Sequence, residues 1–490
     1  MALALDGKGH LHAQAYRALR AAIVHGAWTP GQRLPGGRQL ASELALSRNT
    51  LSAALEQLRS EGYIAPRTRS GWYVSAQLPE DSAPEPAAPR TTPDPQRRPL
   101  QLSAAARALS EHGVGSWELP HHKGMIDFRY GEPAYREQPL ETWARLLSRH
   151  VRQARSRDLS YRAPGGHPAL RAALAAYLAR ARGVRCSPSQ VIVTTGSQQA
   201  LDLCARVLID PGQRVGIEDP HYPGVRFAFA QARAELVPVP VDDEGLVCSS
   251  LQRQRLRLAC VTPSHHYPTG VELTPERRSA LLAWARERDS FIVEDDYDSE
   301  FRYAGRPLPS LQSLDEHERV LYVGTLSKLL FPALRIGYLV VPEPLCEAFL
   351  CAKAAVDTGA AGLEQAALAE LIASGELERH ARRTRLRNAA RRATLHAALT
   401  AKLGARMRCP GAPAGLHMWL ELPQLPAAAA RAVRRSGLQR GVAVYTGDVC
   451  YLSRPRHASL VLGYANLSGV QIERGVERLA AAVAEVEAAR

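Results

Sequence analysis

The sequence lacks any apolar run approaching the roughly 20 residues that cross a membrane, and its first residues contain no apolar core of a signal peptide. Its eight cysteines are scattered, and none forms a Cys-x-x-Cys pair or lies among histidines at zinc-binding spacing. These absences argue against a membrane-spanning protein, a disulfide framework and a metal centre. We therefore expect a soluble cytoplasmic protein with reduced thiols and no bound metal.

Acidic residues are outnumbered, because 62 Lys and Arg stand against 48 Asp and Glu and give a formal net charge of +14. A basic balance favours nucleic acid or another anionic partner. Arginine-rich codon usage in a GC-rich genome explains the same number equally well. The 490 residues, 46% of them hydrophobic, suffice for two or more domains with at least one sizeable core.

A change of composition divides the chain near residue 76. The prolines that follow are Pro79, Pro84, Pro86, Pro89, Pro93, Pro95 and Pro99. Proline removes amide donors and blocks helix, so we expect this segment to be extended and poorly packed. We interpret residues 77–125 as a linker between a head, residues 1–76, and a larger domain, residues 126–490. The alternative is an ordered loop that wraps around one domain.

The head has the pattern of three helices followed by a hairpin with a basic tip. The apolar positions of the three helices are Tyr16, Leu19 and Ile23, then Leu40 and Leu44, then Leu51, Ala54, Leu55 and Leu58. The first helix is expected to end at Gly26, and Ser47 is expected to cap the third. Short strands over residues 63–66 and 71–75 flank the tip and predict a wing.

Two helices joined by a turn in so short a domain are what reading a DNA major groove requires. The second helix of the motif begins with the candidate contacts Ser47, Arg48, Asn49 and Thr50. The planar guanidinium of Arg48 is best suited to base edges or phosphates. Arginines on flanking loops are expected to contact backbone phosphates; they are Arg33, Arg38, Arg67 and Arg69. A small helical interaction module with solvated arginines is the alternative.

Beyond the linker, short apolar strands alternate with helical segments. The strand candidates are residues 191–194, 214–218, 256–261, 291–294, 320–324 and 336–341. This alternation predicts an α/β fold with a mostly parallel sheet. From about residue 363 the chain becomes Arg- and Ala-rich helix, and alternating segments around 416–420 and 460–462 follow. We expect a smaller C-terminal α+β subdomain over residues 363–490.

The strongest single signal is the sequence GTLSK at residues 324–328, which follows a buried strand. The amine of Lys328 can form a Schiff base with an aldehyde. Thr325, Ser327 and Arg335 are placed to face a phosphate. Taken alone, a surface lysine beside a surface arginine would be the simpler interpretation.

Acids lie at the end of another apolar strand, in the sequence FIVEDDY at residues 291–297. A carboxylate there can pair with a protonated pyridine nitrogen, since ligands of open α/β sheets bind at the carboxyl ends of strands. Asp295 is our choice and Asp296 the alternative, because adjacent strand residues point to opposite faces. Tyr297 is placed to hydrogen-bond a phenolic oxygen. Paired acids at a strand end are otherwise helix caps.

Three further segments contain candidates for the same site. A Gly turn leads into a helix that begins at Ser197 and Gln198, where amides and the helix dipole favour a phosphate. Tyr222 offers a ring to stack on a pyridine, with a buried core tyrosine as the alternative. His265 lies in a rigid turn, residues 262–270, which either places a histidine near the ring or is a plain turn.

Residues 11–75 resemble a GntR-type winged helix-turn-helix over their whole length. The matching strings are AIVHG at 22–26, PGQRLP at 30–35, RQLA at 38–41, SRNT at 47–50 and LRSEGY at 58–63. One departure is that Gly36 and Gly37 stand where the family usually has two serines. A hydroxyl that caps a helix or contacts a phosphate is therefore missing.

Residues 126–480 resemble fold-type I enzymes that use pyridoxal 5′-phosphate (PLP), the aspartate aminotransferase superfamily. Together with the head, this makes the chain similar to the MocR subfamily of regulators. The resemblance implies PLP on Lys328, Asp295 at the pyridine nitrogen, Tyr297 at the phenolic oxygen and Arg335 at the phosphate. It also implies a head-to-tail homodimer, in which Tyr161 reaches the phosphate of the partner subunit.

Two departures bear on function. Related enzymes grip a substrate carboxylate with an arginine on a C-terminal strand, but the matching stretch here, residues 459–465, contains none. Arg454 and Arg456 lie just upstream. Gly224 offers no polar side chain for an effector.

We therefore expect a PLP-responsive transcriptional regulator that binds operator DNA. We expect it to control genes for PLP synthesis or for amine and amino-acid metabolism. It is expected to respond to PLP with or without an amine or amino-acid effector. The alternatives are a working aminotransferase with a DNA-binding head and a repressor with a vestigial PLP site.

Overall fold

The computed structural model describes residues 3–67, 71–79, 101–112, 122–305 and 308–489. Contacts divide the chain into two compact units, Met1–Leu100 and Gln101–Arg490. Each unit has its own hydrophobic core. None of the described helices is long and apolar enough to cross a membrane.

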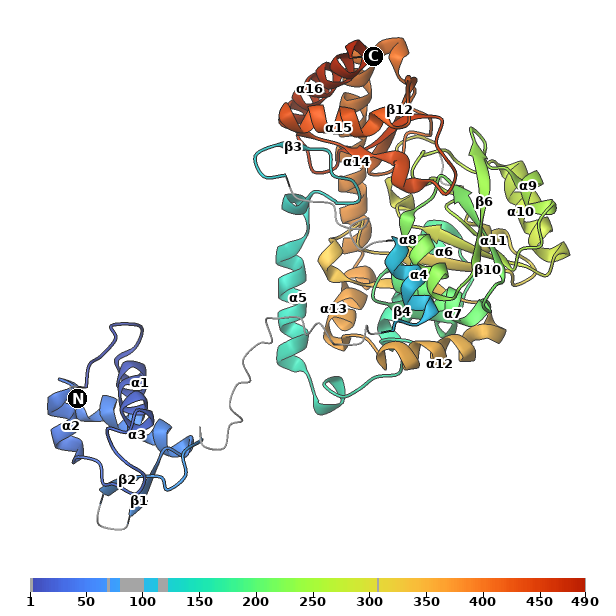
Figure 1. The fold of residues 1–490 in the computed structure, drawn as a ribbon. Helices are drawn as coiled ribbons and strands as arrows, with labels where there is room; N and C mark the ends of the chain where they lie inside the picture. Colours follow the sequence, from blue (N-terminus) through green and yellow to red (C-terminus); the bar gives the residue numbers. More distant parts are fainter. Residues whose placement is uncertain (1–2, 68–70, 80–100, 113–121, 306–307, 490) are drawn as a thin grey trace. The chain divides into compact units, whose positions relative to one another are not determined.

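The first unit is a winged helix-turn-helix, as the sequence predicts. Helices α1 (Leu11–Val24), α2 (Gly37–Glu43) and α3 (Arg48–Ser60) precede the hairpin of β1 (Ile64–Arg67) and β2 (Gly71–Val74) (Figure 1). The apolar positions of the three helices meet in one core that includes Leu19, Leu40 and Leu55. The backbone of residues 31–34 adds a third, strand-like edge to β2, because the Leu34 amide donates to the Trp72 carbonyl at 2.9 Å.

The cap of α2 is missing, in line with the glycine substitution seen in the sequence. Gly36 is the N-cap residue, has an extended backbone, and offers no side-chain hydrogen bond. In contrast, Ser47 caps α3 by accepting a hydrogen bond from the Thr50 amide at 3.2 Å. The helix that carries the candidate DNA contacts is therefore the better fixed of the two.

Part of the expected linker is helical. Helix α4 (Ala104–His112) lies within residues 77–125 and packs against α8 (Pro223–Gln231) of the second unit. Residues 80–100, where most of the prolines fall, lie outside the described residues.

The second unit is built around an eight-stranded sheet of order β4-β11-β10-β9-β8-β5-β6-β7. In chain order the strands are β4 (Val191–Thr194), β5 (Arg214–Asp219), β6 (Glu235–Asp242), β7 (Gly245–Leu246), β8 (Leu258–Val261), β9 (Phe291–Asp296), β10 (Val320–Thr325) and β11 (Gly337–Val340). All six strands expected from the sequence are present, and only β11 and β7 run antiparallel to their neighbours. The sheet is therefore mostly parallel, as predicted.

Helices cover this sheet on both faces. Successive residues of β4 enter different cores, since Val191 and Val193 pack in one cluster and Ile192 in another. The helices of this part, besides α4 and α8, are α5 (Leu140–Gln153), α6 (Pro168–Arg182), α7 (Ser197–Leu208), α9 (Cys248–Gln252), α10 (Pro275–Glu287), α11 (Leu311–Leu314), α12 (Cys346–Asp357) and α13 (Gly362–Ala373). Burial of both faces explains why the strands are continuous apolar runs.

The C-terminal subdomain is α+β, as expected, but it also recruits an earlier segment. Its elements are α14 (Glu376–Leu403), β12 (His417–Pro426), α15 (Ala429–Gln439), β13 (Val442–Ala443), β14 (Tyr445–Thr446), β15 (His457–Gly463) and α16 (Gly469–Ala488). Strand β3 (Ile126–Asp127) pairs in parallel with β13, and Phe128 is buried in the subdomain core. Figure 1 shows β3 beside the C-terminal helices.

A buried ion pair ties α6 to the end of β9. The Arg182 Nε donates to Asp296 Oδ2 at 2.7 Å, and the two side chains are only 6% and 1% exposed. The Tyr322 hydroxyl also donates to Asp296. If either side chain is replaced by an uncharged one, the other remains buried without an opposite charge.

We expect Arg182→Met to lower the free energy of unfolding of this unit by about 3–5 kcal/mol, because Asp296 then remains buried and uncompensated. Arg180 lies on the same helix in an exposed ion pair with Glu378, so Arg180→Met is a matched control that should cost less than about 1 kcal/mol. Urea unfolding of the full-length variants measures both. Equal losses would contradict the role assigned to the buried pair.

Candidate functional site

The first candidate site is the exposed N-terminal end of α3. Ser47 and Thr50 are engaged in capping, since their hydroxyl oxygens lie 2.8 Å apart and Ser47 also accepts the Thr50 amide. Arg48 and Asn49 are exposed. Of the four residues that the sequence singles out here, these two are therefore accessible to a ligand, and the other two hold the helix end.

Two of the flanking arginines meet at the wing. The Arg67 guanidinium lies over the Tyr73 ring, 4.5 Å from its centroid. Arg33 pairs with Tyr73 through an isolated backbone bridge, and its Nε is 3.5 Å from the position a Cβ would occupy at Gly71. Arg38 is exposed at the start of α2. Arg69 lies outside the described residues.

The second candidate site is a cavity of about 450 Å³ at the carboxyl edge of the large sheet. Nine of the eleven residues that the sequence proposes for PLP or its surroundings line it, and the other two, His265 and Tyr161, do not. The nine are Ser197, Gln198, Tyr222, Asp295, Tyr297, Thr325, Ser327, Lys328 and Arg335.

 These residues lie at the carboxyl ends of β5, β9 and β10, at the start of α7 after β4, and, for Arg335, just before the antiparallel strand β11. They meet because the carboxyl ends of parallel strands lie at one edge of a sheet.

The structure separates the roles of the two adjacent acids on β9. Asp296 is bound by Arg182 and Tyr322 and does not line the cavity. Asp295 lines it, and its Oδ1 is buried without a hydrogen-bond partner among the described residues. Burial raises the pKa of Asp295 to about 7, Asp296 adds to the rise and Lys328 opposes it. A cationic ring nitrogen in the cavity would satisfy this carboxylate.

Lys328 stands in the same cavity, three residues after β10. Its Nζ donates to the Gly131 carbonyl at 2.8 Å. Removal from water lowers the pKa of Lys328, while Asp298, Asp295 and nearby Glu132 oppose the shift. A lowered pKa increases the fraction of neutral amine, which is the form that attacks an aldehyde.

One end of the cavity is suited to a phosphate. Helix α7 begins at Ser197 after Gly196, whose φ of 107° favours glycine. The Arg335 Nη2 lies 3.1 Å from the position a Cβ would occupy at Gly196, so a side chain there would press on the guanidinium. The Ser327 Oγ is buried and, in the described part of the chain, has no hydrogen-bond partner. A guanidinium, a hydroxyl and a helix start suit an anionic ligand.

The aromatic wall differs in one respect from the sequence interpretation. His265 is not on the cavity wall: its Nδ1 is joined to the Tyr297 hydroxyl at 2.9 Å and to Asp298 at 3.0 Å, one layer behind. Tyr267 and His417 line the cavity instead. Tyr267 belongs to the turn already singled out, whereas His417 begins β12 and no local signal connects it to the site.

The sequence interpretation also missed Arg129 and Glu132, which line the cavity. They belong to the segment after β3, and the Arg129 Nε forms an ion pair with Glu132 Oε1 at 2.6 Å. A Gly-Glu-Pro turn after a short strand was the only signal, and many surface turns share it. The tertiary pairing of β3 with β13 brings this segment to the site.

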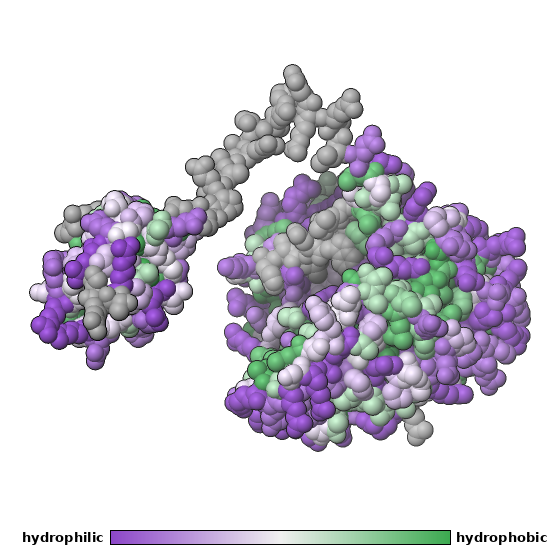
Figure 2. Space-filling view, turned by 90° about the horizontal axis from the view of Figure 1, so that it is seen from below, coloured by the Kyte–Doolittle hydropathy of each residue, from purple (hydrophilic) through white to green (hydrophobic). Residues whose placement is uncertain are grey.

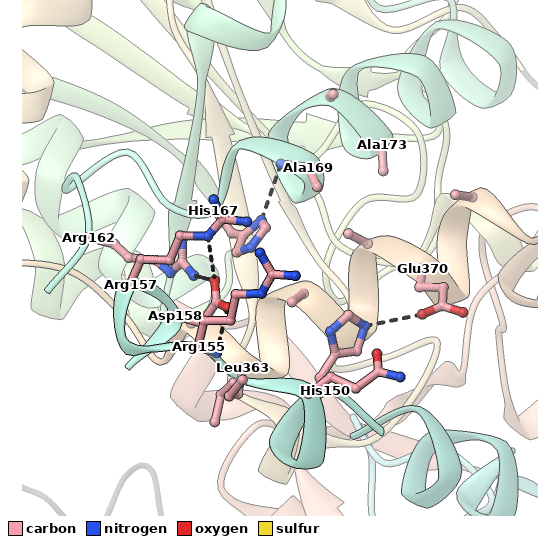
Figure 3. Close-up of a pocket in the computed structure, with 17 residues that line it drawn as sticks. His150, Arg155, Arg157, Asp158, Arg162, His167, Ala169, Ala173, Leu363 and Glu370 are labelled. Carbon is pink, nitrogen blue, oxygen red and sulfur yellow. Dashed lines mark hydrogen bonds and ion pairs between the residues drawn. The ribbon is translucent and has the colours of Figure 1, made fainter. Parts of the chain in front are cut away.

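Tyr161 lies away from this cavity and is 94% exposed. Its neighbours Asp158 and Arg162 form an ion pair at 3.0 Å on the wall of a separate surface groove of about 970 Å³ (Figure 3). The floor of the groove is largely alanine, and His150 and Glu370 close one side. None of the residues expected to bind PLP lines the groove, whereas nine of them line the smaller cavity, which is therefore the candidate PLP site.

Comparison with known proteins agrees with both parts of the chain. Residues 11–74 match the family of bacterial regulatory proteins of the gntR type, and residues 123–479 match aminotransferase class I and II. The chain is 36% identical over 490 residues to the probable rhizopine catabolism regulatory protein MocR of Rhizobium meliloti, covering 98% of this chain and 95% of that protein.

Two further relatives match about three quarters of the chain. The pyridoxine biosynthesis transcriptional regulator PdxR of Corynebacterium glutamicum is 31% identical over 367 residues, 75% of this chain and 74% of that protein. The crystal structure of the α-aminoadipate aminotransferase LysN of Thermus thermophilus has a TM-score of 0.68 and 31% identity, covering 79% of this chain and 96% of that one.

We expect Arg48→Ala to weaken binding to duplex DNA about tenfold or more, because a bidentate base contact contributes about 1–3 kcal/mol. The duplex is one selected by the wild-type protein from a random-sequence library, and fluorescence anisotropy measures the Kd. Arg59→Ala, at the opposite end of α3 in an ion pair with Glu56, is the control and should leave the Kd unchanged. Equal affinity of Arg48→Ala and wild type would refute the assigned contact.

Proposed function

The chain belongs to the MocR subfamily of GntR-type transcriptional regulators, and from this premise we propose that it binds PLP on Lys328 and that PLP occupancy changes its affinity for operator DNA. The protein is a DNA-binding regulator with an aminotransferase-like domain. Bound PLP supplies an aldehyde carbon that condenses reversibly with a primary amine. The residues of the cavity would hold PLP in position for this reaction.

The observation that carries the proposal is that Asp295 and Lys328 line the same cavity. A buried carboxylate oxygen that lacks a partner in the described structure and a lysine with a lowered pKa are both costly to maintain unless a ligand uses them. PLP has a ring nitrogen for Asp295 and an aldehyde for Lys328. Thus the two groups fit two separate functional groups of one molecule.

The remaining contacts follow from the same arrangement. Tyr297 would donate to the phenolic oxygen, with His265 fixing the orientation of its hydroxyl, and Tyr222 would pack on the ring. The phosphate would be held by Ser197, Gln198, Thr325, Ser327 and Arg335. The absence of an arginine from residues 459–465 argues against the alternative of a working aminotransferase.

We propose that the regulator is a head-to-tail homodimer in which Tyr161 completes the PLP site of the partner subunit. Support comes from the exposure of Tyr161 and of two apolar neighbours, Val151 at 53% and Leu159 at 69%. Figure 2 shows apolar patches among the polar surface on one face of the larger unit. A phenol this exposed has no packing role within its own chain.

The genes controlled are proposed to serve PLP synthesis or the use of amines and amino acids. Two relatives support this proposal, a pyridoxine biosynthesis transcriptional regulator and a probable rhizopine catabolism regulatory protein. A gene for PLP synthesis transcribed divergently beside the regulator's own gene would strengthen the first choice.

We expect wild-type protein mixed with PLP to absorb in the visible and Lys328→Ala to lose that band, because the Schiff base requires this amine. The chain has five lysines, Lys8, Lys123, Lys328, Lys353 and Lys402, so borohydride reduction and peptide mass spectrometry identify the modified one. Lys402→Ala, on α14, is the control. An adduct on another lysine, or none, refutes the assignment.

The regulatory half of the proposal is tested on the same preparations. We expect PLP to change the Kd of wild-type protein for its selected duplex about threefold or more, and to leave that of Lys328→Ala unchanged, because a ligand shifts an equilibrium only through differential affinity for the two states. An unchanged wild-type Kd means that PLP is a bystander in DNA binding.

We expect Tyr161→Phe to weaken PLP retention, since the hydroxyl contact from the partner subunit is lost. Dialysis against PLP-free buffer, followed by absorbance, measures retention, and dilution below the dimer dissociation constant should remove the difference from wild type. Leu159→Ala is the control for the loop. Full retention by Tyr161→Phe at every protein concentration would refute the shared site.

A further inference from the structure

Two charged side chains of the cavity have no part in the PLP contacts proposed above. Arg129 and Glu132 line the cavity wall and are ion-paired at 2.6 Å, with side chains 17% and 14% exposed. Besides Lys328 and Arg335, Arg129 is the only Lys or Arg among the described lining residues. Since Lys328 and Arg335 are used by the aldehyde and the phosphate, Arg129 is the cation left for another ligand.

The backbone of Arg129 is held beside the last residue of β15. The Gly463 amide donates to the Phe128 carbonyl at 2.8 Å. A Cβ at Gly463 would lie 2.1 Å from the Arg129 carbonyl oxygen, so only glycine allows the segment to cross so closely. The backbone at residue 129 is thus fixed by β15 and by the pairing of β3 with β13.

Arg129 is also close to Lys328. The Lys328 Nζ bonds the carbonyl of Gly131 at 2.8 Å, and Cα atoms two residues apart are separated by at most about 7 Å. Glu132, the ion-pair partner of Arg129, is near enough to Lys328 to oppose the lowering of its pKa. A small molecule that reacts near Lys328 therefore has Arg129 within reach.

No other position supplies a cation to this side of the cavity in the described structure. The buried end of β15, with Val461 and Leu462, is apolar. Arg454 and Arg456 are exposed and do not line the cavity. Gly224 itself has no side chain, and a Cβ there would lie 2.2 Å from the Tyr222 ring and 2.5 Å from Gln198 Oε1, so a larger residue would have to displace one of them.

We propose that Arg129 binds the carboxylate of an amino-acid effector whose amine reacts at the PLP site, and that Glu132 positions the guanidinium. The inference rests on the proposed function. The effector nitrogen replaces the Lys328 nitrogen on the aldehyde carbon, so one C=N bond forms and one breaks. The effector nitrogen enters as an ammonium group and gives up its three protons, the Lys328 nitrogen leaves as an ammonium group and gains three, and no oxidant or reductant is needed.

This assignment restores carboxylate recognition without an arginine on the C-terminal strand. A guanidinium presents several N–H donors in one plane and suits a carboxylate better than a single ammonium does. If the site recognised only the amine of the effector, any small primary amine could react. Recognition of the carboxylate distinguishes an amino acid from the amine that lacks it.

The experiment titrates PLP-loaded protein with pairs of ligands and follows the visible absorbance. The pairs are glycine and methylamine, L-alanine and ethylamine, β-alanine and ethylamine, and 4-aminobutyrate and propylamine. For at least one pair we expect wild type to bind the acid about tenfold or more tightly than the amine, the size expected of a charge-assisted hydrogen-bonded pair. Arg129→Ala should reduce the preference to less than about twofold and leave amine binding unchanged.

Matched variants separate recognition from folding. Arg129→Gln keeps a polar side chain without the charge and should behave like Arg129→Ala, whereas Arg129→Lys should retain part of the preference. Arg454→Ala should behave like wild type. The thermal midpoint and the visible band before titration report whether each variant folds and holds PLP.

Two results would overturn the inference: wild type that prefers none of the acids over its amine, or Arg129→Ala and Arg129→Gln that keep the full preference. Failure of the proposed function is distinguishable, since wild-type protein then has no visible band before any ligand is added. Loss of preference in Arg454→Ala would move the carboxylate site to the segment before β15.

Discussion

Three consecutive acids on β9 are buried at the edge of the large sheet, and the way each is compensated underlies the site. Glu294 accepts hydrogen bonds from the Leu311 and Gln312 amides at 2.9 and 3.0 Å, and Asp296 is bound by Arg182. Asp295, between them, points to the other face and into the cavity. Because burying a carboxylate is costly without a partner, the fold stabilises two of the acids itself and leaves one for a ligand.

Hydrogen bonds and one close backbone approach run from the turn before α7 to the surface groove of the same unit. The Thr195 amide donates to Gln199, and Gln199 donates to Asp357, both at 2.9 Å. Asp357 is also bound by buried Lys353 at 2.6 Å. A Cβ at Gly359, two residues on, would meet the carbonyl of Arg162, a residue of the groove, at 3.2 Å.

Local signals predicted the elements well. The six strand candidates, the three head helices and the lysine after β10 are recognisable because strand burial, helical spacing and turn residues act over a few neighbouring positions. The same signals left open whether Asp295 or Asp296 faces the cavity. They also left open whether His265 lies near the ring, and the structure puts it behind Tyr297. They passed over His417 and Arg129.

By itself, the sequence determined the two-part organisation, the winged head, the mostly parallel sheet and the positions of Lys328 and Asp295 at strand ends. Only the tertiary structure decided which side chains share the cavity. The partner of Asp296 comes from α6, and Arg129 arrives because β3 pairs with β13 more than 300 residues later in the chain. Contacts over such separations depend on how whole layers pack, and no spacing within a short segment encodes them.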